Sequence, residues 1–329
     1  CASALLPSVL QRLNVAHHSE LGHCSGAALE GLVLKHPFYD VDLPILLGDH
    51  VTDDSGTGCV HTAPDHGLDD YLVASGYKIG TLNYISDNGV FRKDLKFVGG
   101  QHVYRVDKLI LDVLKTNGKL LAVSEFSHSY AHCWRTKTPL IFRATPQWFI
   151  SMSENTLLAA AQLAVDNVRW VPSWGSARIK GMLESSPDWC VSRQRTWGVP
   201  IAFFVNRENG ELHPRTPELL EMVAKRVEVE GIEAWYDLEL DEFLGQEAKD
   251  YIKTNDTLDV WFDSGVTHFS VLTARLQLDT PADLYLEGSD QHRGWFQSSL
   301  KTSIAMRGIP PYKEVLTHGF AVDNRGRKM

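Results

Sequence analysis

The sequence has no long apolar run, no paired cysteines and no excess of basic residues. No apolar stretch approaches the roughly 18 residues that a membrane-spanning helix needs, so we expect no membrane partner. The 5 cysteines are scattered and include no Cys-x-x-Cys pair, which favours reduced thiols in a cytosolic protein over a disulfide framework or a zinc knuckle. The formal net charge of −9 excludes a generally basic nucleic-acid coat but is compatible with a local basic groove.

The second half of the chain shows strands that alternate with helices. At 329 residues the chain is too long for one ordinary core, so we expect at least two domains. The purely apolar run 201–205 is typical of a parallel strand buried on both faces. Strands at 284–286 and 315–320 end in polar loops, and a helix follows the first of them from about 294. This order predicts a doubly wound parallel sheet, with the acidic segment 206–255, which holds a helix near 216–226, as an insertion.

In the first half, the segment 53–71 carries the residues of greatest interest. Gly56 and Gly58 flank Thr57, so backbone amides can approach a ligand closely there. His61 ends a predicted short strand, and Asp70 lies where a helical pattern begins. The alternative is that the two residues are structural: His61 is a histidine at a strand end whose hydrogen bonds are satisfied, and Asp70 is an acid that caps a helix. The other elements expected here are strands at 32–34 and 45–47, a hairpin at 81–100 that turns at Asn88-Gly89, and helices at about 106–117 and 154–167.

Three polar segments are candidates for a binding site. In 283–295, two carboxylates, an amide, an imidazole and a guanidinium follow a short strand, where open α/β sheets bind ligands. A solvated turn that caps the next helix is the alternative. In 189–197, two arginines lie between two tryptophans, which suits phosphate contact with stacking or else a structural patch over a helix end. In 127–135, two histidines and a cysteine lack a second ligand pair, so we predict no metal site.

Four motifs in a fixed order resemble the class I aminoacyl-tRNA synthetases, and within them the isoleucine enzymes. The motifs are Trp-Cys-Val-Ser-Arg-Gln-Arg-Thr-Trp-Gly-Val-Pro (189–200), Leu-Asp-Val-Trp-Phe-Asp-Ser-Gly (258–265), Glu-Gly-Ser-Asp-Gln-His-Arg-Gly-Trp-Phe (287–296) and His-Gly-Phe with Gly-Arg-Lys-Met (318–329). Segment 53–71 resembles the core of the editing domain inserted in those enzymes. The resemblance implies part of a mixed β-rich editing domain at 1–100, a connection at 101–170, and the second half of a Rossmann-like catalytic domain at 171–329.

The resemblance also implies a reaction and its partners. These enzymes activate an amino acid, here L-isoleucine, with ATP and its Mg²⁺, and transfer it to tRNA, here tRNA(Ile). An apolar pocket separates isoleucine from valine by only about 1–3 kcal/mol, so a second site hydrolyses valine products. A cytoplasmic monomer is expected, and a zinc of the full-length protein would lie outside this chain. The alternatives are a valyl- or leucyl-tRNA synthetase, a stand-alone aminoacyl-tRNA deacylase, and a non-catalytic tRNA-binding relic.

By the same resemblance, individual residues receive roles. Lys328 is the expected catalytic residue, because lysines of the Lys-Met-Ser-Lys-Ser loop stabilise charge on the transferring phosphates. Trp261 and Trp295 would wall the amino-acid pocket. The residues expected to hold ATP or the aminoacyl-adenylate are Glu287, Gly288, Asp290, Gln291, His318, Gly319, Lys328 and Met329. Those of the editing pocket are Thr57, His61 and Asp70, with Asp70 receiving the ammonium group.

The chain also departs from the family pattern. It contains no His-Ile-Gly-His motif, no threonine-rich strand to face His61, and only the first lysine of the Lys-Met-Ser-Lys-Ser loop. Ala131 stands where the family has proline. We therefore expect an internal fragment that does not aminoacylate tRNA alone.

Overall fold

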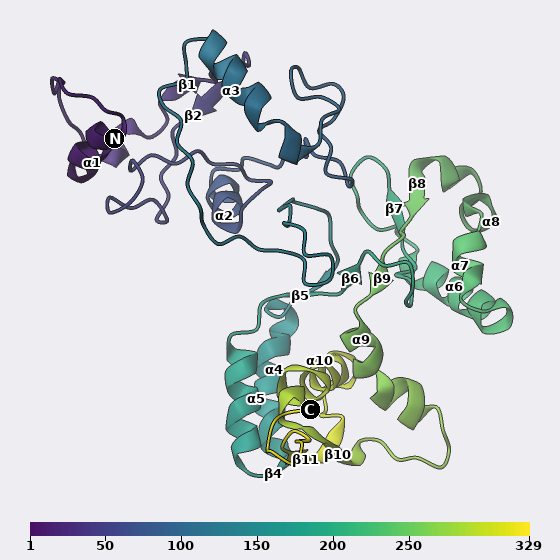
Figure 1. Cartoon of the computed structure of the whole chain (residues 1–329). Coiled ribbons are helices and arrows are strands. Elements are labelled where there is room, and N and C mark those ends of the chain that lie inside the picture. The colour runs from purple at the N-terminus through teal and green to yellow at the C-terminus, as the bar shows by residue number, and fades with distance from the viewer. The chain divides into compact units, whose positions relative to one another are not determined.

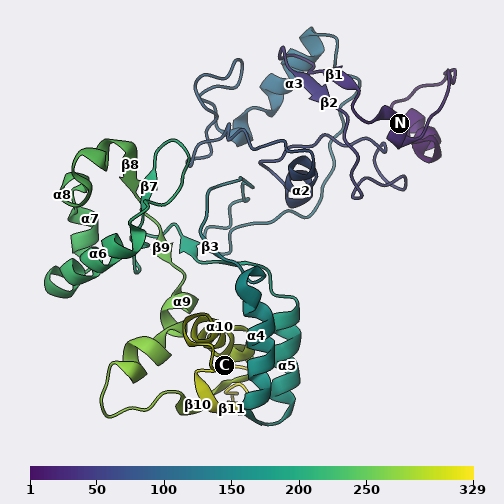
Figure 2. The same cartoon turned by 180° about the vertical axis from the view of Figure 1, so that it is seen from behind.

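The computed structural model describes residues 1–329, which form two compact units, Cys1–Pro146 and Gln147–Met329. Figures 1 and 2 show the elements of both units from opposite sides. Each unit is described separately below. The functional boundaries predicted near residues 100 and 170 stay predictions.

The first unit consists of short elements joined by long loops. Its helices and strands are α1 (Leu6–Arg12), β1 (Val33–Lys35), β2 (Asp42–Pro44), α2 (Leu68–Gly76) and α3 (Asp107–Thr116). The predicted helices at 106–117 and at Asp70 are confirmed as α3 and α2. Gly118, with φ +62°, follows the end of α3 in the left-handed conformation that commonly ends helices.

Three strand predictions in this unit are wrong or only partly right. The second strand is β2, not 45–47. A hydrogen bond from His36 N to Val41 O (3.0 Å) closes the turn after β1, so that pairing with β1 already begins at Asp42. The segment that ends at His61 forms no strand. The hairpin at 81–100 is reduced to a turn with a single bridge between Ile85 and Phe91, and Gly89 adopts φ +74° in it. The β-rich character expected of this unit is thus limited to two short strands and isolated bridges.

The second unit is built on a parallel sheet with strand order β10-β11-β4. Its strands are β4 (Arg169–Val171), β10 (Ala282–Gly288) and β11 (Tyr312–His318), and its main helices are α4 (Leu157–Ala164), α5 (Trp174–Glu184) and α10 (Trp295–Arg307). Ile179, Leu183, Phe296, Leu300 and Val315 are fully buried in one core between these elements. The predicted α/β class, the parallel strands near 284 and 315, and the helix after 294 are confirmed.

The segment around 206–255 forms a module with a core of its own. Strand β7 (Phe204–Asn206) pairs antiparallel with β8 (Tyr251–Lys253), and three helices follow β7: α6 (Thr216–Glu230), α7 (Glu233–Asp237) and α8 (Leu240–Leu244). The prediction of a parallel strand at 201–205 is wrong. Phe204 and Val205 at its end are buried, and Phe204 packs with Leu219, Trp235 and Leu244 of the module itself.

Short antiparallel pairs connect this module to the rest of the second unit. They are β3 (Phe149–Ile150) with β5 (Trp189–Cys190), and β6 (Ser192–Arg193) with β9 (Thr257–Leu258). Helix α9 (Val260–Gly265) begins directly after β9 and is followed by a π-helical turn, His268–Thr273. The motifs 189–200 and 258–265 are therefore neighbours through strand pairing.

Candidate functional site

The register of the parallel sheet brings two predicted site segments together. Gly288 pairs with His318 and Glu287 with Thr317, so β10 and β11 end side by side. Gly319 follows His318 at the same edge. A Cβ on Gly288 would lie 2.8 Å from Asp290 Oδ1, so a side chain here would displace the Asp290 carboxylate. This edge is where open parallel sheets bind ligands.

The loop after β10 divides its polar side chains between structural and exposed roles. Gln291 Oε1 accepts a hydrogen bond from the Trp295 backbone N–H (2.9 Å) at the start of α10, so the amide caps that helix. His292 is fully buried between the Trp170 and Phe296 rings, and burial lowers its pKa. Glu287 and Asp290 are exposed. Both interpretations of the loop are thus partly realised: two side chains support the helix, and two carboxylates face solvent.

The two tryptophans predicted to wall a pocket lie on neighbouring helices. The Trp295 ring stacks on Tyr285 with 4.0 Å between centroids, and its indole N–H donates to Ser264 O (2.9 Å) in α9. Trp261, also in α9, is 42% exposed. A Cβ on Gly294 would lie 2.9 Å from Cη2 of Trp261. Because Gly294 has no side chain, the Trp261 ring can lie beside the start of α10.

Lys328 and Met329 lie in a small hairpin that follows β11. Met329 N donates to Ala321 O (3.0 Å), and Asp323 N donates to Arg327 O (2.9 Å). The Lys328 ammonium lies 3.6 Å from the centroid of the Phe320 ring. No hydrogen bond or ion pair connects Lys328 to the loop after β10 in this state of the protein.

The editing candidates are only partly brought together. Asp70 Oδ2 accepts a hydrogen bond from Ala63 N (3.1 Å), which holds the carboxylate beside the segment that contains His61. His61 is exposed and lies close enough to His36 to contribute, after burial, to the lowered pKa of His36. The Thr57 hydroxyl instead donates to Cys59 O (2.9 Å) within its own loop.

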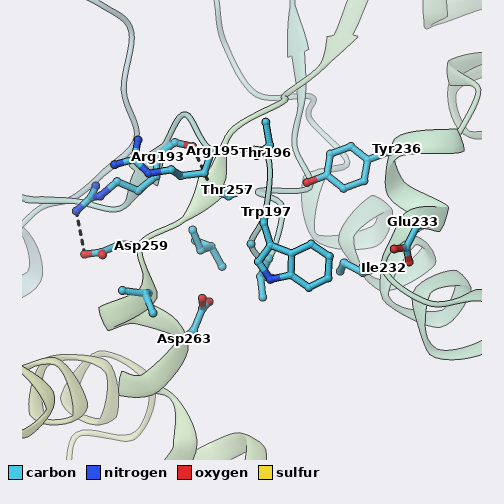
Figure 3. A pocket seen from close by; sticks show the side chains of 14 residues that line it. Arg193, Arg195, Thr196, Trp197, Ile232, Glu233, Tyr236, Thr257, Asp259 and Asp263 are labelled. Atoms are coloured by element: carbon cyan, nitrogen blue, oxygen red, sulfur yellow. Dashed lines mark hydrogen bonds and ion pairs between the residues drawn. The ribbon is translucent and has the colours of Figure 1, made fainter. Parts of the chain in front are cut away.

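The second unit also contains a cavity of about 810 Å³, which Figure 3 shows from close by. Its wall comes from the motif 189–200, from β9 and α9, and from α7 of the module. The lining residues are Arg193, Arg195, Thr196, Trp197, Gly198, Val199, Ile232, Glu233, Tyr236, Thr257, Leu258, Asp259, Val260 and Asp263. Sequence reasoning identified the arginines and Trp197 but missed the cavity and its acidic wall. The spacing of Asp259 and Asp263 on one helical face was the only available signal.

Asp259 is the most tightly held residue of this cavity. It is 4% exposed, and its Oδ2 accepts from Arg193 Nη2 (3.0 Å) and Trp189 Nε1 (3.1 Å). Its Oδ1 accepts from the backbone N–H of Trp261 (3.3 Å), so it caps α9. Burial raises the pKa of Asp263 one turn later, and the Asp259 carboxylate raises it further.

No group of three or more histidines, cysteines, aspartates or glutamates is arranged to hold a metal ion. His128 and His132 of the segment considered above each bond a backbone carbonyl, of Ser129 and Tyr130. None of the helices is both long and apolar enough to span a membrane.

Comparison with known proteins assigns the chain to a family. The family model "tRNA synthetases class I (I, L, M and V)" matches residues 60–329. The isoleucine–tRNA ligases of Teredinibacter turnerae and of a Marinomonas species are 60% and 62% identical over 328 residues, which is 100% of this chain and 35% of each relative. The chain thus spans about a third of the length of these relatives. A solved ternary complex, LeuRS-tRNA-LeuAMS of Agrobacterium radiobacter K84, aligns with 44% of this chain and 21% of its own at 22% identity, with a TM-score of 0.31. The chain belongs to the class I tRNA synthetases (I, L, M and V).

Proposed function

We propose that this chain is part of an isoleucine–tRNA ligase. The full-length enzyme activates L-isoleucine with ATP to isoleucyl-adenylate, transfers it to tRNA(Ile), and hydrolyses valine products. It acts as a monomer in the cytoplasm. Within it, residues 1–100 belong to the editing domain, 101–170 lead back to the catalytic domain, and 171–329 form the second half of the Rossmann-like catalytic domain.

The observation that carries the proposal is the pairing of Gly288 with His318 at the edge of the parallel sheet. Exposed carboxylates of Glu287 and Asp290 are suited to accept from ribose hydroxyls or an ammonium group. Gly288 leaves room for close approach of a ligand to the backbone. His318 and Gly319 lie on the neighbouring strand end, where they would contact the adenine.

Three further groups of residues take their proposed roles from the resemblance. Gln291 would join the adenylate site. The hairpin with Lys328 and Met329 would close over the phosphates of ATP and its Mg²⁺, where the positive charge of the lysine offsets the negative charge of the phosphates. Trp261 and Trp295 would enclose the isoleucine side chain. Thr57, His61 and Asp70 would serve the editing site, with Asp70 binding the ammonium group.

The test is amino-acid-dependent ATP–pyrophosphate exchange by the full-length enzyme with isoleucine, valine and leucine. Isoleucine should give the highest kcat/KM, with valine lower by about 10- to 200-fold, because a pocket gains only about 1–3 kcal/mol from one methylene. Preference for valine or leucine would replace the proposal with a valyl- or leucyl-tRNA synthetase. Absence of exchange together with hydrolysis of misacylated tRNA would identify a deacylase.

We further propose that the cavity beside Arg193 receives the single-stranded end of tRNA. Trp197 is 83% exposed at its rim and Tyr236 lies across from it in Figure 3, which suits base stacking, while Arg195 suits phosphate contact. Trp197→Ala and Arg195→Ala should each lower the rate of transfer to tRNA by about 10-fold, since one stacked base contributes about 1–3 kcal/mol. Isoleucine-dependent exchange without tRNA should stay within about 2-fold of wild type.

Arg207→Ala is the matched control, because Arg207 is an exposed arginine of the module that bonds Lys249 O outside the cavity wall. It should leave both rates unchanged. If Trp197→Ala lowers exchange and transfer equally, the cavity supports the fold of the motif rather than tRNA.

A further inference from the structure

Asp259 connects the cavity to the start of the helix that carries Trp261. Its two carboxylate oxygens face different partners: Oδ2 binds Arg193 and the Trp189 indole, and Oδ1 binds the Trp261 backbone. The backbone of Asp259 is anchored as well, because its N–H donates to Val191 O (2.7 Å). One buried carboxylate thus links the cavity wall, strand β5 and the first turn of α9.

Arg193 is held as firmly as its partner. Its Nη1 donates to Cys190 O (2.9 Å) and Ser192 O (2.8 Å), so the guanidinium is fixed to the backbone of its own segment. The ion pair with Asp259 therefore has little freedom to rearrange. A carboxylate that is 4% exposed would be costly to leave without this cation, since uncompensated buried charges destabilise proteins strongly.

At the start of α9, the Trp261 ring has little room to move. The ring lies against Gly294, where even one methyl group would approach Cη2 to 2.9 Å, and Gly294 precedes Trp295. A small rotation of the first turn of α9 would therefore move the ring relative to Gly294 and to Gln291, whose Oε1 lies against the same glycine. The cap made by Asp259 is the polar contact that fixes this turn.

We propose that Asp259 is a positioning residue: through its pair with Arg193 it sets the position of Trp261 and so couples the cavity to the isoleucine pocket. The inference rests on the proposed function, because it assigns Trp261 to that pocket. Asp259 is not one of the residues proposed to contact isoleucine or ATP. Its effect is exerted through the N-terminus of α9, and it should therefore change substrate affinity more than the chemical step.

The test uses the full-length enzyme with Asp259→Asn, Arg193→Met, Arg193→Lys and the double variant Asp259→Asn/Arg193→Met. Asparagine keeps the shape and one acceptor oxygen, which can serve the helix cap, but it removes the charge that pairs with Arg193 and replaces Oδ2 with an amide nitrogen that accepts no hydrogen bond from Arg193 or Trp189. We expect Asp259→Asn to raise the KM for isoleucine in pyrophosphate exchange by about 10-fold, with kcat within about 3-fold of wild type. The double variant should be no worse than the single variants, and Arg193→Lys should restore part of the loss in Arg193→Met.

Asp283→Asn is the charge-matched control, because it removes an exposed carboxylate paired with Lys313 (2.7 Å) at the start of β10. It should leave KM and kcat unchanged. An unchanged KM in Asp259→Asn, or additive effects of the two substitutions, would overturn the inference while wild-type exchange still supports the function. Absence of isoleucine-dependent exchange in the wild type would instead reject the proposed function.

Discussion

Gly294→Ala is expected to lower isoleucine-dependent ATP–pyrophosphate exchange by about 100-fold, one of the two largest effects predicted for this protein. The added Cβ would lie 2.5 Å from Gln291 Oε1 and 2.9 Å from Cη2 of Trp261. Both distances are shorter than van der Waals contact, so the amide, the indole ring or the start of α10 must move. Every one of these shifts displaces a residue proposed to surround the isoleucyl-adenylate.

Steady-state exchange kinetics of the full-length enzyme measure this effect, and Gly181→Ala is the matched control. Gly181 lies in α5, is exposed, and a Cβ there meets no atom within 4 Å. Alanine at this position should leave exchange unchanged and should stabilise the helix by up to about 1 kcal/mol. Wild-type kinetics in Gly294→Ala would show that Trp261 and Gln291 do not border the amino-acid pocket.

Lys301→Met is expected to stabilise the protein by about 1–3 kcal/mol at pH 7. Lys301 lies on α10, is 8% exposed, and borders a small cavity of about 70 Å³. Burial lowers its pKa from 10.5 to about 8, which corresponds to roughly 3 kcal/mol against the charged form. A hydrogen bond to Ser186 Oγ (2.7 Å) and the Trp189 ring, 5.7 Å away, offset part of this cost.

The stabilisation expected from Lys301→Met depends on pH. Below about pH 8 the lysine is protonated in both the folded and the unfolded states, so the folded state bears the full cost of burying a cation. Between about pH 8 and 10.5 the folded state releases the proton and the unfolded state retains it, so the free energy of unfolding of the wild type rises. The advantage of Lys301→Met should therefore be greatest at neutral pH and shrink as the pH approaches 10.5.

Urea denaturation followed by circular dichroism at pH 7 and pH 10 measures this difference. Lys313→Met is the control, because Lys313 is an exposed lysine paired with Asp283, and Asp283 raises its pKa. It should not stabilise the protein at neutral pH. A loss of stability in Lys301→Met at pH 7 would mean that the contacts with Ser186 and Trp189 outweigh the cost of burying the charge.

The contiguous motifs and the helices were predictable from the sequence, because their signals are local. Helix α10 begins after a glycine and ends before Gly308, which has φ +69°, and its buried apolar side chains, Phe296, Leu300 and Ile304, recur with helical spacing. The polar loop at 287–293 follows an apolar strand, so its place at the carboxyl end of that strand was also predictable. The family resemblance was predicted from the same contiguous motifs, and the family model matches residues 60–329.

The antiparallel pairing of the run 201–205 and the cavity were not predicted, because they depend on residues distant in the sequence. The run 201–205 is apolar enough for a parallel strand, but it is buried by Trp235 and Leu219 of the module and pairs antiparallel with β8. A short apolar run indicates that its side chains are buried, but it does not indicate which segment packs against them.

The amino-acid sequence thus established the α/β class, the order of the polar loops and the residue types at the proposed adenylate site. Tertiary structure determined which of them meet: Gly288 lies beside His318 through sheet register, and Asp259 binds Arg193 because β6 and β9 pair. The physical reason is that side-chain chemistry and helical or strand periodicity are properties of neighbouring residues. Register and ion pairing, in contrast, are properties of segments that only folding brings into contact.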